Sequence, residues 1–306
     1  MNNTVNDLHH SLWSHIFRHG TMFRAVEYSV FITTFMLDLR ILNLLSSVRM
    51  VKKIHCCWFG ADMPESVQNN IALWKKANFD FEIKVHTEAN INISGNRYAK
   101  AALENHAWAF LSDIVRLQAL YEEGGVYLDV DVELIRPLSD LVENADKLTM
   151  GYMYNCALGT AVIYSPPRHP IIRDVLKRYE KIKPGEFPVN NSIFTEYFIN
   201  SVPGFLLNGK EWENEFCHIY PKEFFEQPAF IRNRGISIHH CCGSWKPHAT
   251  SLFKNLVSYS MLSHLKKWLA RKWRTYRACQ CNEFNPVYRA ALQGKSIPFH
   301  ARWYSN

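Results

Sequence analysis

Residues 112–131 read S-D-I-V-R-L-Q-A-L-Y-E-E-G-G-V-Y-L-D-V-D, and this stretch decides the fold expected for the chain. Apolar residues recur at helical spacing as far as Tyr121, which predicts a helix. The helix is expected to begin either at Ser112, a good N-cap residue, or earlier, near Ala101. Two glycines then end it in a tight turn, and the β-branched run 126–132 is typical of a strand. The segment therefore reads as helix, turn, strand and acidic pair.

The acidic pair is Asp129 and Asp131. Two residues apart on a strand, their side chains would point to the same side of the sheet. Such carboxylates repel each other, and a divalent cation with a preference for oxygen ligands, Mg²⁺ or Mn²⁺, would offset the repulsion. Taken alone, however, a D-x-D pattern is more often two solvated aspartates at the end of a strand.

Asp113 and Arg116 lie three residues apart and share one face of the expected helix. The simplest interpretation is a surface ion pair of little energetic weight. Beside a metal site, the same pair would instead bind a polar ligand.

Further segments extend the α/β pattern. The runs 52–58 and 81–85 are expected strands, and Val67, Ile71 and Trp74 mark a helix between them. Strand, helix and strand predict a right-handed βαβ unit with a parallel sheet. The apolar run 159–165 and a helix at 171–179 follow. We expect an α/β, Rossmann-like mixed sheet flanked by helices, with a site beyond the carboxyl ends of its strands.

Composition and cysteine spacing restrict the class of protein. The chain has 306 residues and a formal net charge of +7, which suits one α/β domain that favours anionic partners. No nucleic-acid-binding motif is present, so no nucleic-acid partner is expected. The eight cysteines include no C-x-x-C pair, and no signal-peptide pattern opens the sequence. These features predict reduced thiols and a cytoplasmic protein.

Two terminal segments flank the expected domain. Residues 1–50 are expected to form a helical extension, because Asp38 and Arg40 interrupt the apolar run 28–45 and make it a poor membrane span. Residues 251–306 form a basic amphipathic segment, since no acidic residue occurs between Glu226 and Glu283. Lysines, arginines and tryptophans within 250–280 favour an anionic membrane surface as a partner. A basic face on an ordinary packing helix is the alternative.

Three motifs together resemble a known family. The pattern S-D-x-x-R-x-x-x-L-Y-x-x-G-G-x-Y-L-D-x-D is similar to the signature of the family 32 glycosyltransferases, and it also occurs in the large clostridial glucosylating toxins. Residues 53–60, K-I-H-C-C-W-F-G, resemble the opening strand of this family. Residues 238–246, I-H-H-C-C-G-S-W-K, resemble its closing element. The resemblance implies one GT-A-type catalytic domain over residues 51–250.

The resemblance also implies roles for individual residues. The metal, Mn²⁺ or Mg²⁺ with a preference for Mn²⁺, would be bound by Asp129, Asp131 and His240, with His239 as the alternative histidine. Asp113 and Arg116 would bind the hydroxyls of the donor sugar, and with the two motif aspartates they form the expected catalytic set. The other donor-binding residues implied are Trp58, Tyr127, Ser244, Trp245 and Lys246. Trp58 would stack on the nucleobase or, alternatively, belong to the core, and residues 244–246 would close over the pyrophosphate.

The activity implied is metal-dependent transfer of a hexose from a nucleotide sugar, with UDP as the expected nucleotide. The acceptor would be a glycan or a lipid-linked oligosaccharide in the synthesis of capsule, O-antigen or another surface polysaccharide. The enzyme would retain anomeric configuration through a front-face mechanism and would lie on the inner face of the plasma membrane. A toxin-like or effector-like transferase acting on proteins, a non-catalytic nucleotide-sugar-binding module and a metal-dependent phosphohydrolase are the alternatives.

Overall fold

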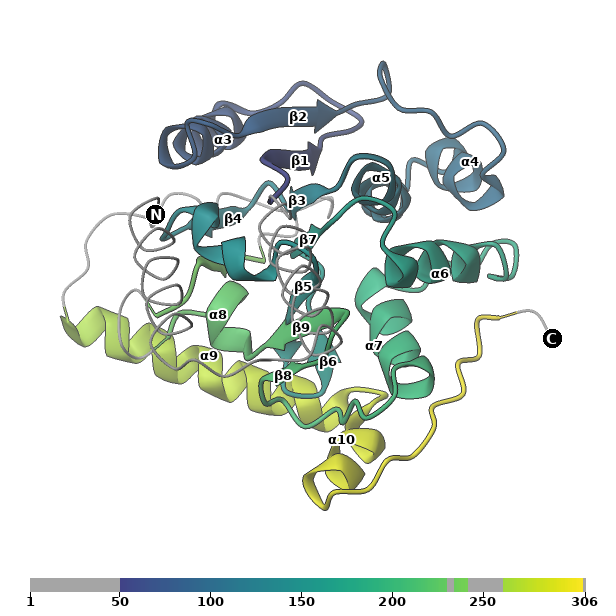
Figure 1. Cartoon of the computed structure of the whole chain (residues 1–306), viewed down its shortest axis with the longest axis vertical. Coiled ribbons are helices and arrows are strands. Elements are labelled where there is room, and N and C mark those ends of the chain that lie inside the picture. The colour runs from purple at the N-terminus through teal and green to yellow at the C-terminus, as the bar shows by residue number, and fades with distance from the viewer. Residues whose placement is uncertain (1–49, 230–233, 242–260, 305–306) are drawn as a thin grey trace, which may run out of the picture. The chain divides into compact units, whose positions relative to one another are not determined.

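A mixed β-sheet lies at the centre of the molecule, with helices on both faces (Figure 1). The structure is a computed structural model that describes residues 50–229, 234–241 and 261–304. The expected extension at 1–50, the residues 244–246 and the first part of the basic segment lie outside the described residues. All described residues belong to one unit, Arg49–Asn306.

The larger sheet has the strand order β2-β1-β3-β7-β5-β9-β8, with β6 paired to β5. Strands β4 and β10 form a separate antiparallel pair. The strands are β1 (Lys53–Cys57), β2 (Glu82–His86), β3 (Gly125–Leu128), β4 (Val132–Leu134), β5 (Leu148–Tyr154), β6 (Ala157–Leu158), β7 (Val162–Ser165), β8 (Trp212–Glu213), β9 (Cys217–Tyr220) and β10 (Ser237–His239). Strand β1 runs parallel to both β2 and β3, whereas β7 runs antiparallel to β3.

The helices divide between the two faces of the sheet, with α5, α6 and α7 on one side and α3 and α8 on the other (Figure 1). They are α3 (Glu65–Ala77), α4 (Arg97–Glu104), α5 (Trp108–Glu123), the 3₁₀ helix η1 (Leu138–Asn144), α6 (Pro170–Tyr179), α7 (Asn190–Ser201), α8 (Lys222–Phe225), α9 (Met261–Cys281) and α10 (Asn285–Leu292). Strand β3 contributes side chains to the core on both faces of the sheet, because Val126 and Leu128 pack on the α3 side and Tyr127 packs on the α5 side. This alternation is the two-residue period of a strand.

The expected βαβ unit is present as β1, α3 and β2, and the helix expected at 171–179 is α6. The α/β fold class predicted from the sequence, a mixed sheet flanked by helices, is confirmed. Helix α5 begins before Ser112, which is therefore not its N-cap. The Ser112 hydroxyl instead donates to the carbonyl of Trp108, 2.9 Å away, within the helix.

The acidic pair does not lie on a continuous strand, so the expectation of a strand over 126–132 is wrong in its second half. Strand β3 ends at Leu128, and the amide of Val132 donates to the carbonyl of Asp129 at 2.9 Å, which closes a turn. The turn lets both carboxylates approach one point beyond the end of β3. Residues 159–161, called here the turn 159–161, connect β6 to β7, so only 162–165 of the apolar run 159–165 form a strand.

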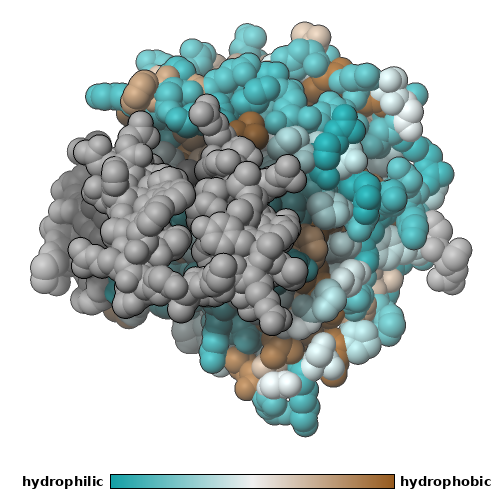
Figure 2. All heavy atoms as spheres, viewed as in Figure 1, coloured by the Kyte–Doolittle hydropathy of each residue, from teal (hydrophilic) through white to brown (hydrophobic). Residues whose placement is uncertain are grey.

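Among the described residues, no helix is both long enough and apolar enough to cross a membrane. Figure 2 shows the described residues of one face as mainly hydrophilic, with hydrophobic residues gathered near its lower edge. The cysteines of the described ranges are free thiols, and the Sγ atoms of Cys156 and Cys279 lie 3.0 Å apart.

Candidate functional site

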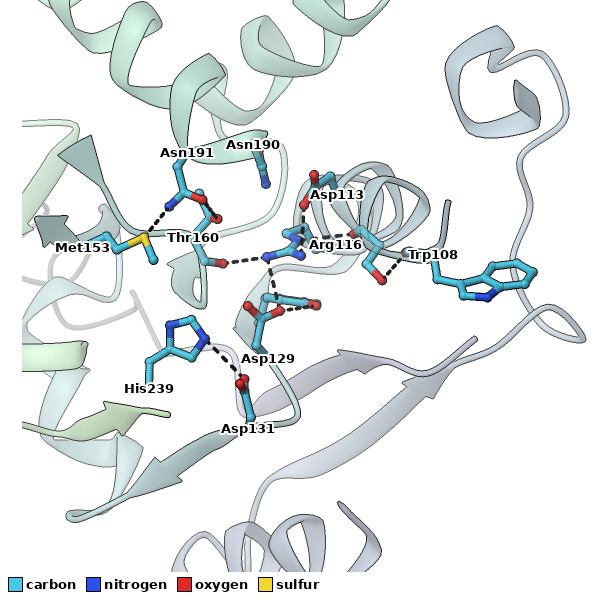
Figure 3. A network of polar contacts seen from close by, with 12 residues as sticks. Trp108, Asp113, Arg116, Asp129, Asp131, Met153, Thr160, Asn190, Asn191 and His239 are labelled. Carbon is cyan, nitrogen blue, oxygen red and sulfur yellow. Dashed lines mark hydrogen bonds and ion pairs between the residues drawn. The ribbon is translucent and has the colours of Figure 1, made fainter. Parts of the chain in front are cut away.

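One turn and one short strand bring three potential metal ligands together. Asp129 and Asp131 come from the turn after β3, and His239 is the last residue of β10 (Figure 3). A carboxylate oxygen of each aspartate and an imidazole nitrogen of His239 all lie within 4.8 Å of one another. The pairing of His239 with Val132 in the β10–β4 ladder sets this arrangement, since Val132 directly follows Asp131.

His240, the expected ligand, is not part of this cluster. Its Nε2 atom lies 2.9 Å from Oε2 of Glu133, and this contact lowers the pKa of the Glu133 carboxyl. Adjacent side chains near a strand end point in opposite directions, so only one of the two histidines can face the aspartates. In the structure it is His239, the alternative histidine, that lies beside the two aspartates.

His239 lies between two carboxylates. Its Nε2 atom is 3.3 Å from Oδ1 of Asp131, and its Nδ1 atom is 2.7 Å from Oε2 of Glu226. Burial acts to lower the pKa of His239, but the neighbouring carboxylates, with Glu226 the strongest, hold it well above its usual range. The centre of the site therefore favours positive charge.

Arg116 connects the metal-ligand cluster to helix α5. Its guanidinium is buried and lies 3.0 Å from Oδ1 of Asp113 and 3.4 Å from Oδ1 of Asp129. It donates to the carbonyl oxygen of Thr160 at 2.8 Å and lies over the Tyr127 ring, 4.3 Å from its centroid. Arg116 thus joins Asp113 to Asp129, and the Asp131–His239 pair lies beside them, so the two expected residue pairs form one polar network at this place (Figure 3).

Asp129 is fixed from several sides. The Tyr127 hydroxyl donates to its Oδ1 atom at 2.9 Å, and its own amide donates to the carbonyl of Ala161 at 2.8 Å. Tyr127 is 1% exposed; its ring packs in the core on the α5 side, and its hydroxyl and ring face contact Asp129 and Arg116. The turn 159–161 supplies main-chain oxygens to both halves of the network. Because these are main-chain atoms, the residue types of the turn do not reveal this contribution in the sequence.

Asp113 is buried at the other end of the network. Burial raises the pKa of its carboxyl, and Arg116 counters only part of this effect. Asn190, the first residue of α7, lies beside Asp113 (Figure 3), and its Oδ1 atom accepts a hydrogen bond of 2.9 Å from the Tyr179 hydroxyl. Sequence reasoning missed Asn190, although an asparagine pair at 190–191 precedes an apolar helical run and was a usable signal.

The remaining expected donor-binding residues lie apart from this network or outside the described residues. Trp58 directly follows β1, is half-buried, and donates from Nε1 to the carbonyl of Ala61 at 2.7 Å. Its ring packs against the core on the α3 side. Ser244, Trp245 and Lys246 lie outside the described residues.

Comparison with known proteins agrees with this geometry. Residues 64–150, which contain α5, β3 and the acidic pair, match a family model described as "Glycosyltransferase sugar-binding region containing DXD motif". The match indicates an enzyme of the glycosyltransferase class. A comparison with curated proteins found no match.

Two solved structures are similar at low identity. One is the "PaToxG Glycosyltransferase", with 19% identity and a TM-score of 0.46, covering 51% of this chain and 71% of that chain. The other is a glycosyltransferase involved in the glycosylation of the major capsid of PBCV-1, with 12% identity and a TM-score of 0.38, covering 56% of this chain and 82% of that chain.

Proposed function

We propose that this protein transfers a hexose from a nucleotide sugar, with UDP as the nucleotide, to a glycan or lipid-linked saccharide acceptor, and that the transfer depends on a divalent cation. The observation that carries the proposal is the cluster of Asp129, Asp131 and His239 next to the buried Asp113–Arg116 pair. One half of this network suits a metal-bound pyrophosphate, and the other half suits a sugar with several hydroxyls.

The ligand atoms at the first half fit a divalent cation. Two carboxylates and one imidazole within 4.8 Å of one another provide the mixed oxygen and nitrogen donors that favour Mn²⁺ over Mg²⁺. When bound, the cation would neutralise the negative charge that develops on the pyrophosphate as the bond to the sugar breaks. Arg116, 3.4 Å from Asp129, and Tyr127 hold that carboxylate in place.

Asp113 and Arg116 suit the donor sugar. A carboxylate accepts hydrogen bonds from hydroxyls, and a guanidinium donates to them. Both side chains are less than one-tenth exposed, so their orientation is set before the sugar binds, which lowers the entropic cost of positioning it. In this proposal Trp58 supports the nucleobase, and Ser244, Trp245 and Lys246 contact the pyrophosphate.

The proposed reaction retains the anomeric configuration. The leaving phosphate oxygen would remove the proton of the acceptor hydroxyl on the same face of the sugar, so no enzyme nucleophile is required. The configuration of the product can be read from its anomeric proton coupling by NMR. An inverted product, or a trapped covalent glycosyl-enzyme, would contradict this part of the proposal.

The first experiment measures nucleotide release from a panel of UDP-sugars and GDP-mannose with Mn²⁺, with and without EDTA. We expect slow hydrolysis of one UDP-sugar that EDTA abolishes and that Asp131→Asn reduces by at least about 100-fold, because the metal site loses a charged ligand. Asp140→Asn is the matched control, since that partly exposed aspartate pairs with Arg136 outside the site. The proposal fails if neither nucleotide release nor Mn²⁺-dependent binding of UDP is observed.

We also propose that α9 holds the enzyme at an anionic membrane surface, where a lipid-linked acceptor would be found. Leu269, Trp273 and Tyr276 are 52%, 62% and 58% exposed, and their spacing places them along one face of the helix. Arg274 and Arg277 lie next to this apolar stripe and are also exposed. Apolar and aromatic side chains flanked by cations are the composition that binds the interface of an anionic leaflet.

Co-sedimentation with phosphatidylglycerol-rich vesicles tests this part. Binding should fall several-fold with Trp273→Ser and should disappear with phosphatidylcholine vesicles or in high salt. Phe79→Ser is the matched control, because Phe79 is 81% exposed but lies in the turn after α3. Equal losses in the two variants, or no vesicle binding by the wild type, would rule out a membrane role for α9.

A further inference from the structure

Glu226 is a buried acid behind the metal-ligand cluster that the expected site did not include. It directly follows α8 and is 3% exposed. Its Oε2 atom lies 2.7 Å from Nδ1 of His239, and its carbonyl oxygen accepts the His239 amide at 3.1 Å. Glu226 therefore holds both the main chain and the ring of this histidine.

The direction of this hydrogen bond determines which ring nitrogen can bind a cation. A carboxylate oxygen accepts, so Nδ1 of His239 carries the hydrogen and donates it to Glu226. The Nε2 atom then faces Asp131, 3.3 Å away, on the side where Asp129 also lies. An imidazole fixed in this tautomer presents the Nε2 lone pair to a cation once the Nε2 proton has left.

Charge balance points in the same direction. The side chains of Glu226 and Asp131 contact one imidazole, and an oxygen of Asp129, which also pairs with Arg116, lies within 4.8 Å of it. Buried like charges need compensation. A bound divalent cation would supply the missing positive charge while His239 stays neutral and hydrogen-bonded to Glu226.

Packing fixes the position of the Glu226 carboxylate from its far side. A Cβ atom added at Gly159 would lie 2.3 Å from Oε1 of Glu226 and 2.9 Å from its Cδ. The carboxylate therefore rests directly against the main chain of the turn 159–161, at a distance that glycine permits and a larger residue does not. The neighbouring residue, Thr160, binds Arg116 through its carbonyl oxygen, so the same turn positions both the sugar side and the metal side of the site.

From these contacts we infer that Glu226 is a positioning residue for the metal site, which orients His239 and fixes its tautomer so that Nε2 can bind a divalent cation with Asp129 and Asp131. The inference rests on the proposed metal-dependent function. It adds a carboxylate–histidine–metal arrangement whose carboxylate comes from the residue after α8 and lies on the opposite side of the histidine from the acidic pair.

The test measures the affinity of the full-length protein for Mn²⁺ alone, from the electron paramagnetic resonance signal of free Mn²⁺. We expect Glu226→Gln to weaken Mn²⁺ binding by about 10–100-fold, the usual effect of losing an outer-shell partner. Glu223→Gln is the matched control, because Glu223 lies three residues before Glu226, on α8, but pairs with Lys222 and Lys272; this variant should bind Mn²⁺ like the wild type. Gly159→Ala keeps the glutamate but displaces its carboxylate, and should also weaken binding.

A second readout follows the ring itself. In protein with ¹⁵N-labelled histidine loaded with diamagnetic Mg²⁺, His239 should show the Nδ1–H tautomer, and Glu226→Gln should shift it towards a mixture. Wild-type Mn²⁺ affinity in folded Glu226→Gln and Gly159→Ala would overturn the inference. If Asp131→Asn still lost binding in that case, the proposed function would stand without it. No Mn²⁺ binding by the wild type would instead remove both.

Discussion

Replacing Arg116 with methionine tests whether the buried network depends on a single cation. The new side chain has a similar length and no charge, at a position that is 5% exposed. Asp113 and Asp129 would lose a partner at 3.0 and 3.4 Å. The carbonyl oxygen of Thr160 would lose a donor at 2.8 Å. The substitution therefore removes the positive charge without opening a large cavity.

The expected loss of stability is about 3–5 kcal/mol at pH 8, the cost of leaving buried carboxylates without their counter-charge. Burial already raises the pKa of Asp113, and the loss of Arg116 raises it further. An acid with a raised folded-state pKa stabilises the fold below its unfolded pKa, about 3.9, and loses that contribution as the pH rises towards the folded value. The deficit of Arg116→Met should therefore be smaller at pH 5 than at pH 8.

Urea unfolding followed by tryptophan fluorescence at both pH values measures this deficit. Asp113→Asn, alone and combined with Arg116→Met, completes a double-mutant cycle, and the double variant should recover part of the loss. Arg173→Met is the surface control, since its ion pair with Asp174 is exposed and should contribute about 0–1 kcal/mol. An unfolding midpoint equal to that of the wild type, or a deficit that shrinks as the pH rises, would refute the reasoning.

Three further substitutions probe the scaffold. Partial burial acts to raise the pKa of Glu123, but hydrogen bonds from Lys53 and Lys84, each 2.6 Å long, outweigh it and lower the pKa to about 2. Glu123→Gln should therefore lower the free energy of unfolding by about 1–2 kcal/mol at pH 7. In urea unfolding this difference should fade as the pH falls from about 4.3 towards 2, and a difference that stays constant would contradict the reasoning. Gly125→Ala should cost at least about 2 kcal/mol, because φ is 111° and the new Cβ would lie 2.7 Å from the Lys53 carbonyl oxygen; unchanged thermal unfolding would contradict this. Trp74→Phe should cost about 1–3 kcal/mol, since the indole is fully buried and donates to a main-chain carbonyl of β4 at 2.9 Å; a change within about 0.5 kcal/mol in urea unfolding would show that the contact is dispensable.

Local patterns predicted much of the fold because they report which side of an element is buried. The spacing of Val67, Ile71 and Trp74 identified α3, and the glycine pair correctly ended α5. The start of α5 was harder to predict from the sequence, because the break between α4 and α5 occurs at His106, a non-glycine residue with a φ of 52°. A histidine in the sequence does not predict such a break.

The site was predictable where its residues lie close together in the sequence. Asp113, Arg116 and the acidic pair lie within one helix–turn–strand unit, so their spacing already implied a common location. The histidine was ambiguous, because the register of β10 against β4 decides which of two neighbours faces inwards. The role of Glu226 could not be predicted from the sequence either, because it depends on a tertiary contact between residues thirteen positions apart. Such contacts leave no periodic signal.

The turn 159–161 has a consequence for how this enzyme can change. It holds Arg116 and Asp129 through the carbonyl oxygens of Thr160 and Ala161, and every amino acid carries that oxygen. Another side chain at residue 160 would therefore keep this anchoring oxygen, whereas a Cβ atom at Gly159 would displace the Glu226 carboxylate. Substitutions at residue 160, in evolution or in a saturation library, can therefore change a side chain beside the site while the main-chain oxygens that hold Arg116 and Asp129 stay in place.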